Sequence, residues 1–463
     1  MVFNSVIFIF CFLPIFLLIY YFVPARARNP VLFAGSLFFY AWGDPTYLVV
    51  LMLFSSFFNY YMGKELGKIT DEDPSRKRNL IFAVVINLLI LGFFKYWGFF
   101  LDTISGITGL KLTYPQLALP IGLSFYTFKN LSYILDIYMG KTEPCKGFFP
   151  YAVYSTMFPH MTAGPIVRYT DISESISRRS INTTRLGAGA ELFIKGLSKK
   201  VLLADNLSAL YTTLQASGTT SFVGTWLAIG AYTLELYFDF SGYSDMAIGL
   251  GQMLGFNFNK NFDYPYISTS VSEFWRRWHI SLGSWFRDYI YIPLGGNRVS
   301  TGRHIRNILV VWALTGLWHG ASWNFVFWGI YYGLLLLAEK FLLGRFLEKA
   351  PVWLRNLYTM FAVIIGWVFF SQTTPAAIGK MLGAMFGFGA SCFTDRASLY
   401  ALKSGLILMI ISVISCRPGL YQYFKRLARR NTYLAAVINA ILFFLCIAYM
   451  IYSSYTPFMY QQF

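Results

Sequence analysis

One histidine of the chain, His319, lies in a strongly apolar stretch, LTGLWHGASWNFVFW. An ionisable side chain at membrane depth is costly, so this position favours a functional role over a structural histidine bonded to a backbone carbonyl. An imidazole with a pKa of about 6.5 can accept the proton of a hydroxyl group near neutral pH. The flanking Gly316 and Gly320 permit a close backbone approach or a helix break. We therefore predict that His319 acts as a general base.

A second histidine, His279, lies in a stretch rich in tryptophan and arginine, SEFWRRWHISLGSWFRDYIYIPLGGNR. Ser272 and Glu273 near its start, followed by three tryptophans, indicate an interfacial helix. Guanidinium groups match the geometry of phosphate, which makes four arginines candidates for binding an anionic ligand: Arg276, Arg277, Arg287 and Arg298. Anchoring in the membrane interface by tryptophan and arginine is the alternative interpretation of the same stretch.

Other ionisable residues lie in less informative surroundings. His304 is in a basic loop and is expected to be solvated, whereas His160 follows Pro159 and is a candidate to line a funnel. Acidic residues in apolar runs are costly in lipid unless they are paired, so we expect partners for Asp136, Glu235, Asp239 and Asp245. The sequence contains no zinc-peptidase motif, Walker loop or nucleophile elbow, and its five scattered cysteines predict no metal site.

The last eight residues, TPFMYQQF, combine three aromatic side chains with one phenol, Tyr460. They follow an apolar run, residues 433–452, that is long enough to cross a bilayer. A phenol with a pKa of about 10 needs a base to become nucleophilic at neutral pH. Phe458 and Phe463 would hold such a tail by apolar contact. The alternative is that the tail only packs at the membrane interface, where aromatic residues are common.

The composition places these residues in a membrane protein. Of the 463 residues, 56% are hydrophobic and only 13% are charged, whereas a soluble protein has about 25% charged residues. Apolar runs of bilayer-spanning length recur along the chain and predict an all-α polytopic membrane protein with roughly ten to twelve transmembrane helices. The formal net charge of +17 indicates basic cytoplasmic loops rather than a nucleic-acid partner.

Basic clusters set the expected orientation. They follow the first apolar run and the hairpin at residues 30–62, and they lie between the last two spans, at residues 417–430. The N-terminus and the tail at residues 454–463 are then extracytoplasmic. We expect a bent or double helix at Phe222–Leu254 and two helices at Ile308–Leu343. The broken stretch Lys141–Arg306 predicts re-entrant or interfacial helices around a cytoplasmic funnel. The whole chain, residues 1–463, is expected to form a single membrane domain.

Seven stretches resemble, in the same order, the bacterial branch of the membrane-bound O-acyltransferase (MBOAT) family. They are MVFNSVIFIFCFLP, SLFFYAWGDPTYL, PIGLSFYTFKNLSYILDIY, MFPHMTAGPIVRY, YFDFSGYSDMAIGLG, FWRRWHISLGSWFRDYIYIPLGG and LTGLWHGASWNFVFWG. The resemblance covers nearly the whole chain, and the last three stretches are the most specific. It implies a ring of tilted helices around a central tunnel that joins a cytoplasmic funnel to an outer opening.

The resemblance also implies the chemistry. The catalytic histidine of the family falls on His319, and its second polar position falls on His279. Acetylating members of this branch use cytoplasmic acetyl-CoA as donor and deliver the acetyl group outside. The tail resembles an aromatic motif around a proposed acyl-carrying tyrosine, here Tyr460, although Gln461 stands where another aromatic residue is usual.

The function expected from this resemblance is O-acetylation of a cell-envelope polysaccharide, of peptidoglycan or alginate type, at the inner membrane of a bacterium. The expected partners are membrane lipid, acetyl-CoA as donor substrate, an extracytoplasmic SGNH-type transferase or esterase, and the polysaccharide as final acceptor. Two other classes of protein remain open: a polytopic transporter, whose broken helices and intramembrane acids are similar, and a non-catalytic scaffold for a periplasmic transferase.

Overall fold

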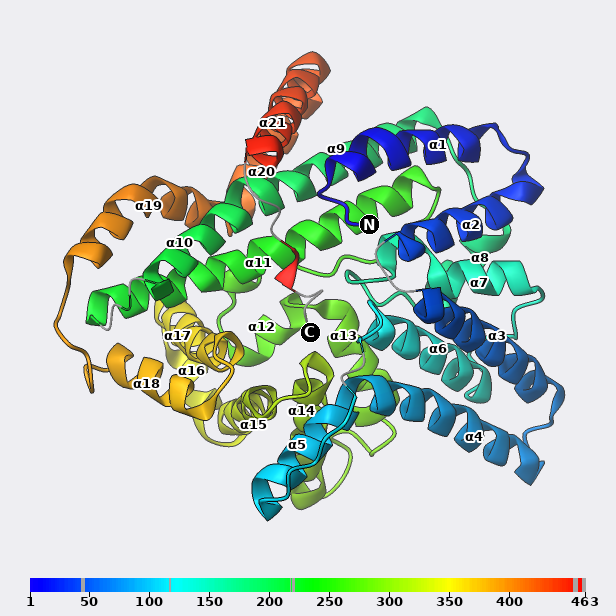
Figure 1. Ribbon diagram of the computed structural model, residues 1–463, viewed down its shortest axis with the longest axis horizontal. Helices are drawn as coiled ribbons and strands as arrows, with labels where there is room; N and C mark the ends of the chain where they lie inside the picture. Colours follow the sequence, from blue (N-terminus) through cyan, green and yellow to red (C-terminus); the bar gives the residue numbers. More distant parts are fainter. Residues whose placement is uncertain (43–45, 116–117, 217, 219–220, 453–456, 460–463) are drawn as a thin grey trace. The chain divides into compact units, whose positions relative to one another are not determined.

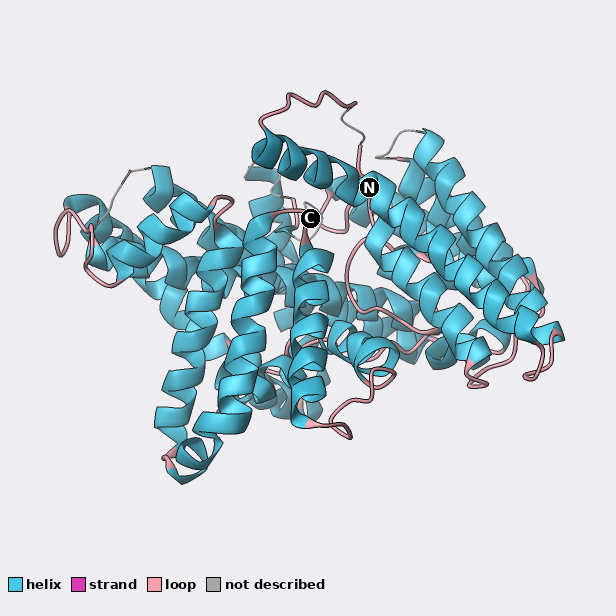
Figure 2. Cartoon of the chain, turned by 90° about the horizontal axis from the view of Figure 1, so that it is seen from below, coloured by secondary structure: helices cyan, strands magenta, loops and turns pink. Residues whose placement is uncertain are grey.

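The computed structural model describes the chain except residues 43–45, 116–117, 217, 219–220, 453–456 and 460–463. All regular secondary structure in the described residues is helical, as Figure 2 shows, which confirms the all-α prediction. The chain divides into two compact units. The first comprises Met1–Phe193 with Ser244–Asn259, and the second comprises Ile194–Tyr243 with Lys260–Phe463.

The α-helices of the described residues are labelled in Figure 1. They are α1 (Leu13–Phe22), α2 (Arg28–Ala41), α3 (Thr46–Lys68), α4 (Pro74–Leu91), α5 (Trp97–Thr108), α6 (Leu123–Tyr138), α7 (Phe148–Thr156), α8 (Tyr169–Ser177), α9 (Thr183–Ser198), α10 (Asp205–Ala216), α11 (Phe222–Met253), α12 (Val271–Arg277), α13 (Ile280–Phe286), α14 (Thr301–His319), α15 (Trp323–Ala338), α16 (Gly344–Lys349), α17 (Val352–Ser371), α18 (Pro375–Met385), α19 (Arg396–Ser415), α20 (Pro418–Arg430) and α21 (Thr432–Tyr452).

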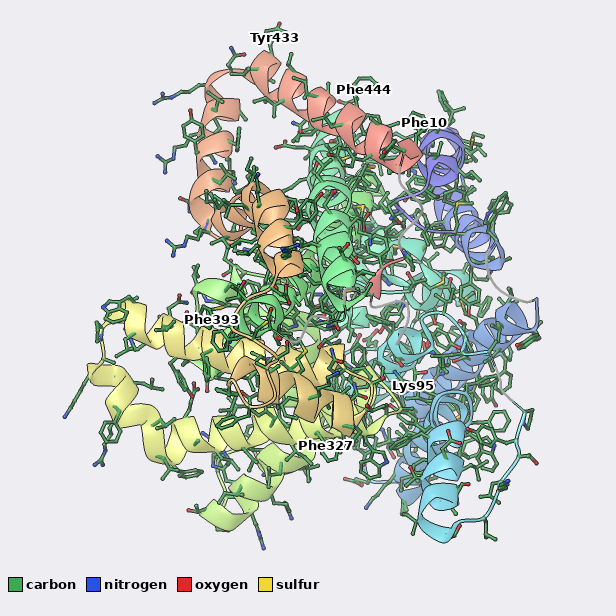
Figure 3. The ribbon with its side chains drawn as sticks, turned by 60° about the vertical axis from the view of Figure 1, so that its left-hand side comes forward. Phe10, Lys95, Phe327, Phe393, Tyr433 and Phe444 are labelled. Carbon is green, nitrogen blue, oxygen red and sulfur yellow. The ribbon has the colours of Figure 1, made fainter. Side chains whose placement is uncertain are left out.

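Five helical segments of the described residues are long and apolar enough to cross a membrane. They are Pro74–Thr108, Trp323–Lys349, Val352–Ser371, Arg396–Ser415 and Thr432–Tyr452. The last of these, α21, exposes large side chains along its length: Tyr433 is 87% and Phe444 is 68% exposed, and both are labelled in Figure 3. Apolar surface of this extent is stable in contact with lipid. The chain is a membrane protein, as its composition predicted.

Polar side chains join neighbouring helices inside the first unit. Asn59 of α3 and Asn87 of α4 exchange two hydrogen bonds of 3.0 and 2.8 Å. Asn130 of α6 donates to the Ser55 hydroxyl of α3 and accepts a hydrogen bond from Tyr151 of α7. Buried amide and hydroxyl groups that satisfy one another in this way fix one relative position of the helices.

One sequence expectation about the helices is confirmed, one is corrected, and one is narrowed to a single alternative. Residues 308–343 contain two helices, α14 and α15, which pack side by side with α17 beyond α15 (Figure 1). The basic segment at residues 417–430, which was expected as a loop, forms the helix α20. The run Phe222–Leu254 does not contain two helices, because α11 continues without a break for 32 residues.

Candidate active site

His319 is the last residue of α14, and its side chain is enclosed by aromatic rings. It is only 2% exposed. Its ring lies 4.9 Å from the ring of Trp328 on α15 and 5.3 Å from that of Phe370 on α17, both at 78°. The neighbouring Trp318 ring lies 5.1 Å away. These rings leave little room for solvent, so a group that reaches the imidazole would meet it in an apolar environment.

Two glycines allow the helices that carry this cluster to approach closely. A β-carbon on Gly316 of α14 would collide with the carbonyl group of Phe325, and one on Gly329 of α15 would collide with that of Trp312. Close backbone contact through small residues is typical of helix pairs in membranes. The predicted role of Gly316 in close backbone approach is therefore confirmed, and this contact fixes where α14 ends and where His319 lies.

His279 interrupts the stretch that was expected to form one interfacial helix. Its backbone is left-handed, with φ 44° and ψ 54°, and it separates α12 from α13. Such a conformation costs of order 1–3 kcal/mol in a non-glycine residue and persists only where the surroundings impose it. Asn261 provides these surroundings, because its carbonyl accepts the Ile280 N–H and its side-chain oxygen accepts the Ser281 N–H.

The imidazole of His279 is buried and oriented by the same asparagine. Its Nδ1 lies 3.2 Å from Asn261 Oδ1, an atom that already accepts two hydrogen bonds from Ser281. Nδ1 must therefore donate, and Nε2 is the accepting nitrogen of the neutral ring. The ring packs 4.7 Å from Phe240 of α11 and 5.7 Å from Trp318. Trp318 thus contacts both predicted histidines, and the structure brings His279 and His319 into one aromatic cluster.

The four predicted phosphate-binding arginines separate into two kinds. Arg277 is committed to Glu273, at 2.9 Å, and to Asp263, and Arg287 is committed to the adjacent Asp288, at 2.6 Å. Arg276 and Arg298 are exposed and form no ion pair with the residues that the structure describes. These two are therefore the better candidates for an anionic ligand. Tyr460, the predicted carrier, lies outside the described residues.

The family model of the membrane-bound O-acyltransferase family matches residues 145–375. A probable alginate O-acetylase, AlgI, of Azotobacter vinelandii is 41% identical over 435 residues, which cover 92% of this chain and 86% of the relative. The AlgI of Pseudomonas aeruginosa is also 41% identical, over 92% of this chain and 83% of the relative. This chain belongs to the MBOAT family. The peptidoglycan O-acetyltransferase of Helicobacter pylori is 33% identical over 84% of this chain and 80% of the relative. As an MBOAT protein, the chain is an acyltransferase.

The other two histidines of this MBOAT protein, His304 and His160, are also buried and have partners of their own. His304 was expected to be solvated, but this is wrong: it is 5% exposed on α14, and its Nε2 lies 2.9 Å from the Tyr291 hydroxyl and 3.3 Å from Lys340 Nζ. His160 is fully buried in the first unit, where its Nδ1 lies 3.1 Å from Lys129 Nζ.

Two of the acids in apolar runs have the partners that we expected. Asp136 lies 3.6 Å from Lys141 Nζ, and Asp239 forms a 2.8 Å ion pair with Lys200. The sequence analysis did not single out Lys200, Asn261 or Trp318. The sequence does offer a signal for Lys200, because this lysine begins the apolar stretch KVLLA and could pair with an acid of another apolar run, such as Asp239. The sequence contains no comparable signal for Asn261, because its role depends on the fold around His279.

Proposed function

We propose that this acyltransferase takes an acetyl group from acetyl-CoA on the cytoplasmic side of a bacterial inner membrane and passes it outward for O-acetylation of a cell-envelope polysaccharide. The observation that carries the proposal is the buried aromatic cluster that joins His319 to His279. The names of the relatives support the acceptor class, because they include alginate O-acetylases and a peptidoglycan O-acetyltransferase. Both termini face outward in this proposal, and a tunnel through a ring of helices connects the two sides.

The first chemical step is acyl transfer from the thioester to Tyr460. His319 accepts the phenol proton, and the phenolate oxygen attacks the thioester carbonyl carbon. The carbon–sulfur bond breaks, and the CoA thiolate leaves and takes up the proton from the imidazolium. The product is a phenyl ester on the tail. His279, which is held by Asn261 with Nε2 as acceptor, packs against Trp318, and Trp318 also contacts the ring of His319.

The second step occurs outside the membrane. A phenyl ester is a more reactive acyl donor than an alkyl ester, because phenolate is the better leaving group. An extracytoplasmic SGNH-type transferase can then take the acetyl group onto its serine and pass it to a polysaccharide hydroxyl. At the cytoplasmic side, the phosphates of acetyl-CoA bind near Arg276 and Arg298, whose guanidinium groups suit phosphate oxygens.

Thioester cleavage by the purified protein tests the proposal. His319→Ala should lower cleavage of acetyl-CoA by about 10²–10⁴-fold, because that is the usual contribution of a general base. His304→Ala is the matched control, since His304 is a buried histidine on the same helix but contacts Tyr291 and Lys340 instead. Substantial turnover by the His319→Ala protein, with intact membrane insertion, would refute the assignment.

A further inference from the structure

Lys200 is the centre of a buried charge cluster that the reaction does not use. Its side chain is 1% exposed, and it lies in the π-helical segment Lys199–Ala204 between α9 and α10. It forms ion pairs of 2.8 Å with Asp205 of α10 and with Asp239 of α11. One buried ammonium group thus faces two carboxylates. The desolvation of such groups is costly unless further hydrogen bonds satisfy the remaining oxygens and protons.

Those further hydrogen bonds come from the segment Pro457–Met459 near the end of the chain. The Met459 N–H donates to Asp239 Oδ2 at 3.0 Å, and Lys200 Nζ donates to the Pro457 carbonyl at 3.3 Å. The acceptor and the donor lie on the two sides of a single residue, Phe458. The cluster therefore contacts main-chain groups: a carbonyl, which every residue possesses, and an N–H, which every residue except proline possesses.

Phe458 fills the space between these two hydrogen bonds. It is 1% exposed, and its ring lies 4.6 Å from Lys200 Nζ and 5.0 Å from the ring of Tyr243, at 90°. A cation above an aromatic face and an edge-to-face ring pair are both favourable contacts. Phe458 was expected to hold the tail by apolar contact, and the structure places it against a lysine and a tyrosine.

The cluster is also connected to the histidines. Asp239, which accepts the Met459 N–H, is followed on α11 by Phe240, whose ring lies 4.7 Å from His279. The histidine in turn contacts Trp318, the neighbour of His319. The tail is thus attached, through adjacent residues of one continuous helix, to the wall of the candidate active site.

We propose that Lys200, Asp205 and Asp239 form a docking site for a peptide, the C-terminal segment of this chain, and that the site fixes the position of Tyr460. The site binds the main-chain carbonyl that precedes an aromatic residue and the main-chain N–H that follows it. The role of docking in acetyl transfer rests on the proposed function. The contacts between the tail and the cluster do not depend on that function. Lys200 and Asp239 are positioning residues, since they contact the tail and not the acetyl group.

Amide hydrogen exchange of the C-terminal peptide tests the docking without reference to activity. The Met459 N–H is bonded to a buried carboxylate, so it should exchange slowly in the full-length protein. Asp239→Asn should accelerate its exchange about tenfold or more, because the acceptor loses its charge and its pairing with Lys200. Glu339→Gln is the matched control: Glu339 is a buried acid whose carboxylate accepts the Val271 and Ser272 N–H groups, so its replacement should leave the exchange of the Met459 N–H unchanged.

Two substitutions in the tail separate recognition of the backbone from recognition of the side chain. Met459→Pro removes the N–H that Asp239 accepts, whereas Met459→Ala retains it. Acetylation of the C-terminal peptide, measured by mass spectrometry, should fall about tenfold or more in Met459→Pro and stay near normal in Met459→Ala. The affinity for acetyl-CoA should be unchanged in both, since neither change alters an arginine that is proposed to bind the donor.

The outcomes distinguish the docking site from the carrier role. Unaltered exchange of the Met459 N–H in Asp239→Asn would overturn the docking site. A Tyr460→Phe protein that remains fully active would overturn the carrier role; faster exchange in Asp239→Asn would still support the docking site in that case. Equal loss of tail acetylation in Met459→Pro and Met459→Ala would contradict recognition through the backbone.

Discussion

His279 shows how a single residue combines backbone strain with chemistry. It and Tyr264 are the non-glycine residues with positive φ in the described part of the chain. Asparagine tolerates the left-handed region well, so His279→Asn should keep the break between α12 and α13 while removing the imidazole. We expect a folded protein with a lower thermal midpoint, because the buried ring packs against Phe240 and Trp318, and acyl transfer lowered by about 10²-fold or more. Thermal unfolding in detergent and a thioester assay measure the two effects.

Tyr264→Asn provides the control for this substitution. Tyr264 has the same class of backbone conformation, with φ 47°, and its ring lies under Lys260. Its replacement should leave acyl transfer intact. If His279→Asn retained full activity, or if both changes reduced it equally, the imidazole of His279 would have no special part in the reaction.

At the scale of elements, the contact between α14 and α15 determines where His319 lies. A β-carbon on Gly316 has no space, because the carbonyl group of Phe325 occupies its position. Gly316→Ala should therefore push the helices apart, lower the stability by about 1–3 kcal/mol and reduce transfer, since His319 is less than one turn away. Thermal unfolding and thioester cleavage in the same detergent measure both consequences.

Gly302→Ala is the matched change on the same helix. A β-carbon on Gly302 would meet nothing within 4 Å, and alanine is favoured over glycine in helices. We expect no loss of stability or activity from it. Equal behaviour of the Gly302→Ala and Gly316→Ala proteins would show that the close helix contact does not position the histidine.

At the scale of the whole molecule, the net charge of +17 means that many basic side chains could attract the phosphates of acetyl-CoA. Arg276 and Arg298 are exposed and form no ion pair with described residues, so they are available for phosphate. Arg276→Gln or Arg298→Gln should weaken acetyl-CoA binding about tenfold, because a hydrogen bond to a charged group contributes about 1.5–3 kcal/mol and surface exposure reduces this. The salt dependence of binding should also become shallower.

Isothermal titration at two salt concentrations checks this prediction. Arg303→Gln is the control, since Arg303 is an exposed base at the start of α14 that has no proposed contact with the donor. A general effect of net charge would make all three variants behave alike. Unaltered affinity in both Arg276→Gln and Arg298→Gln would place the donor site elsewhere on the chain.

The sequence by itself determined the class of protein, and it singled out His319 as the candidate general base. Long apolar runs can be stable only as helices in lipid, because the bilayer core offers no partner for free backbone groups. The helix pair in residues 308–343 follows from the same rule, and His319 stands out because an ionisable group in such a run is costly. These conclusions need only the local composition of the chain.

Only the tertiary structure decided how distant residues combine. The break at His279 depends on Asn261, which is 18 positions away, and the contact of Lys200 with Pro457 joins residues 257 positions apart. Local periodicity records which face of a helix is apolar, but it contains no information about which remote residue meets that face. The burial of His304 was mispredicted for this reason, because packing against other parts of the fold outweighs the local polar signal.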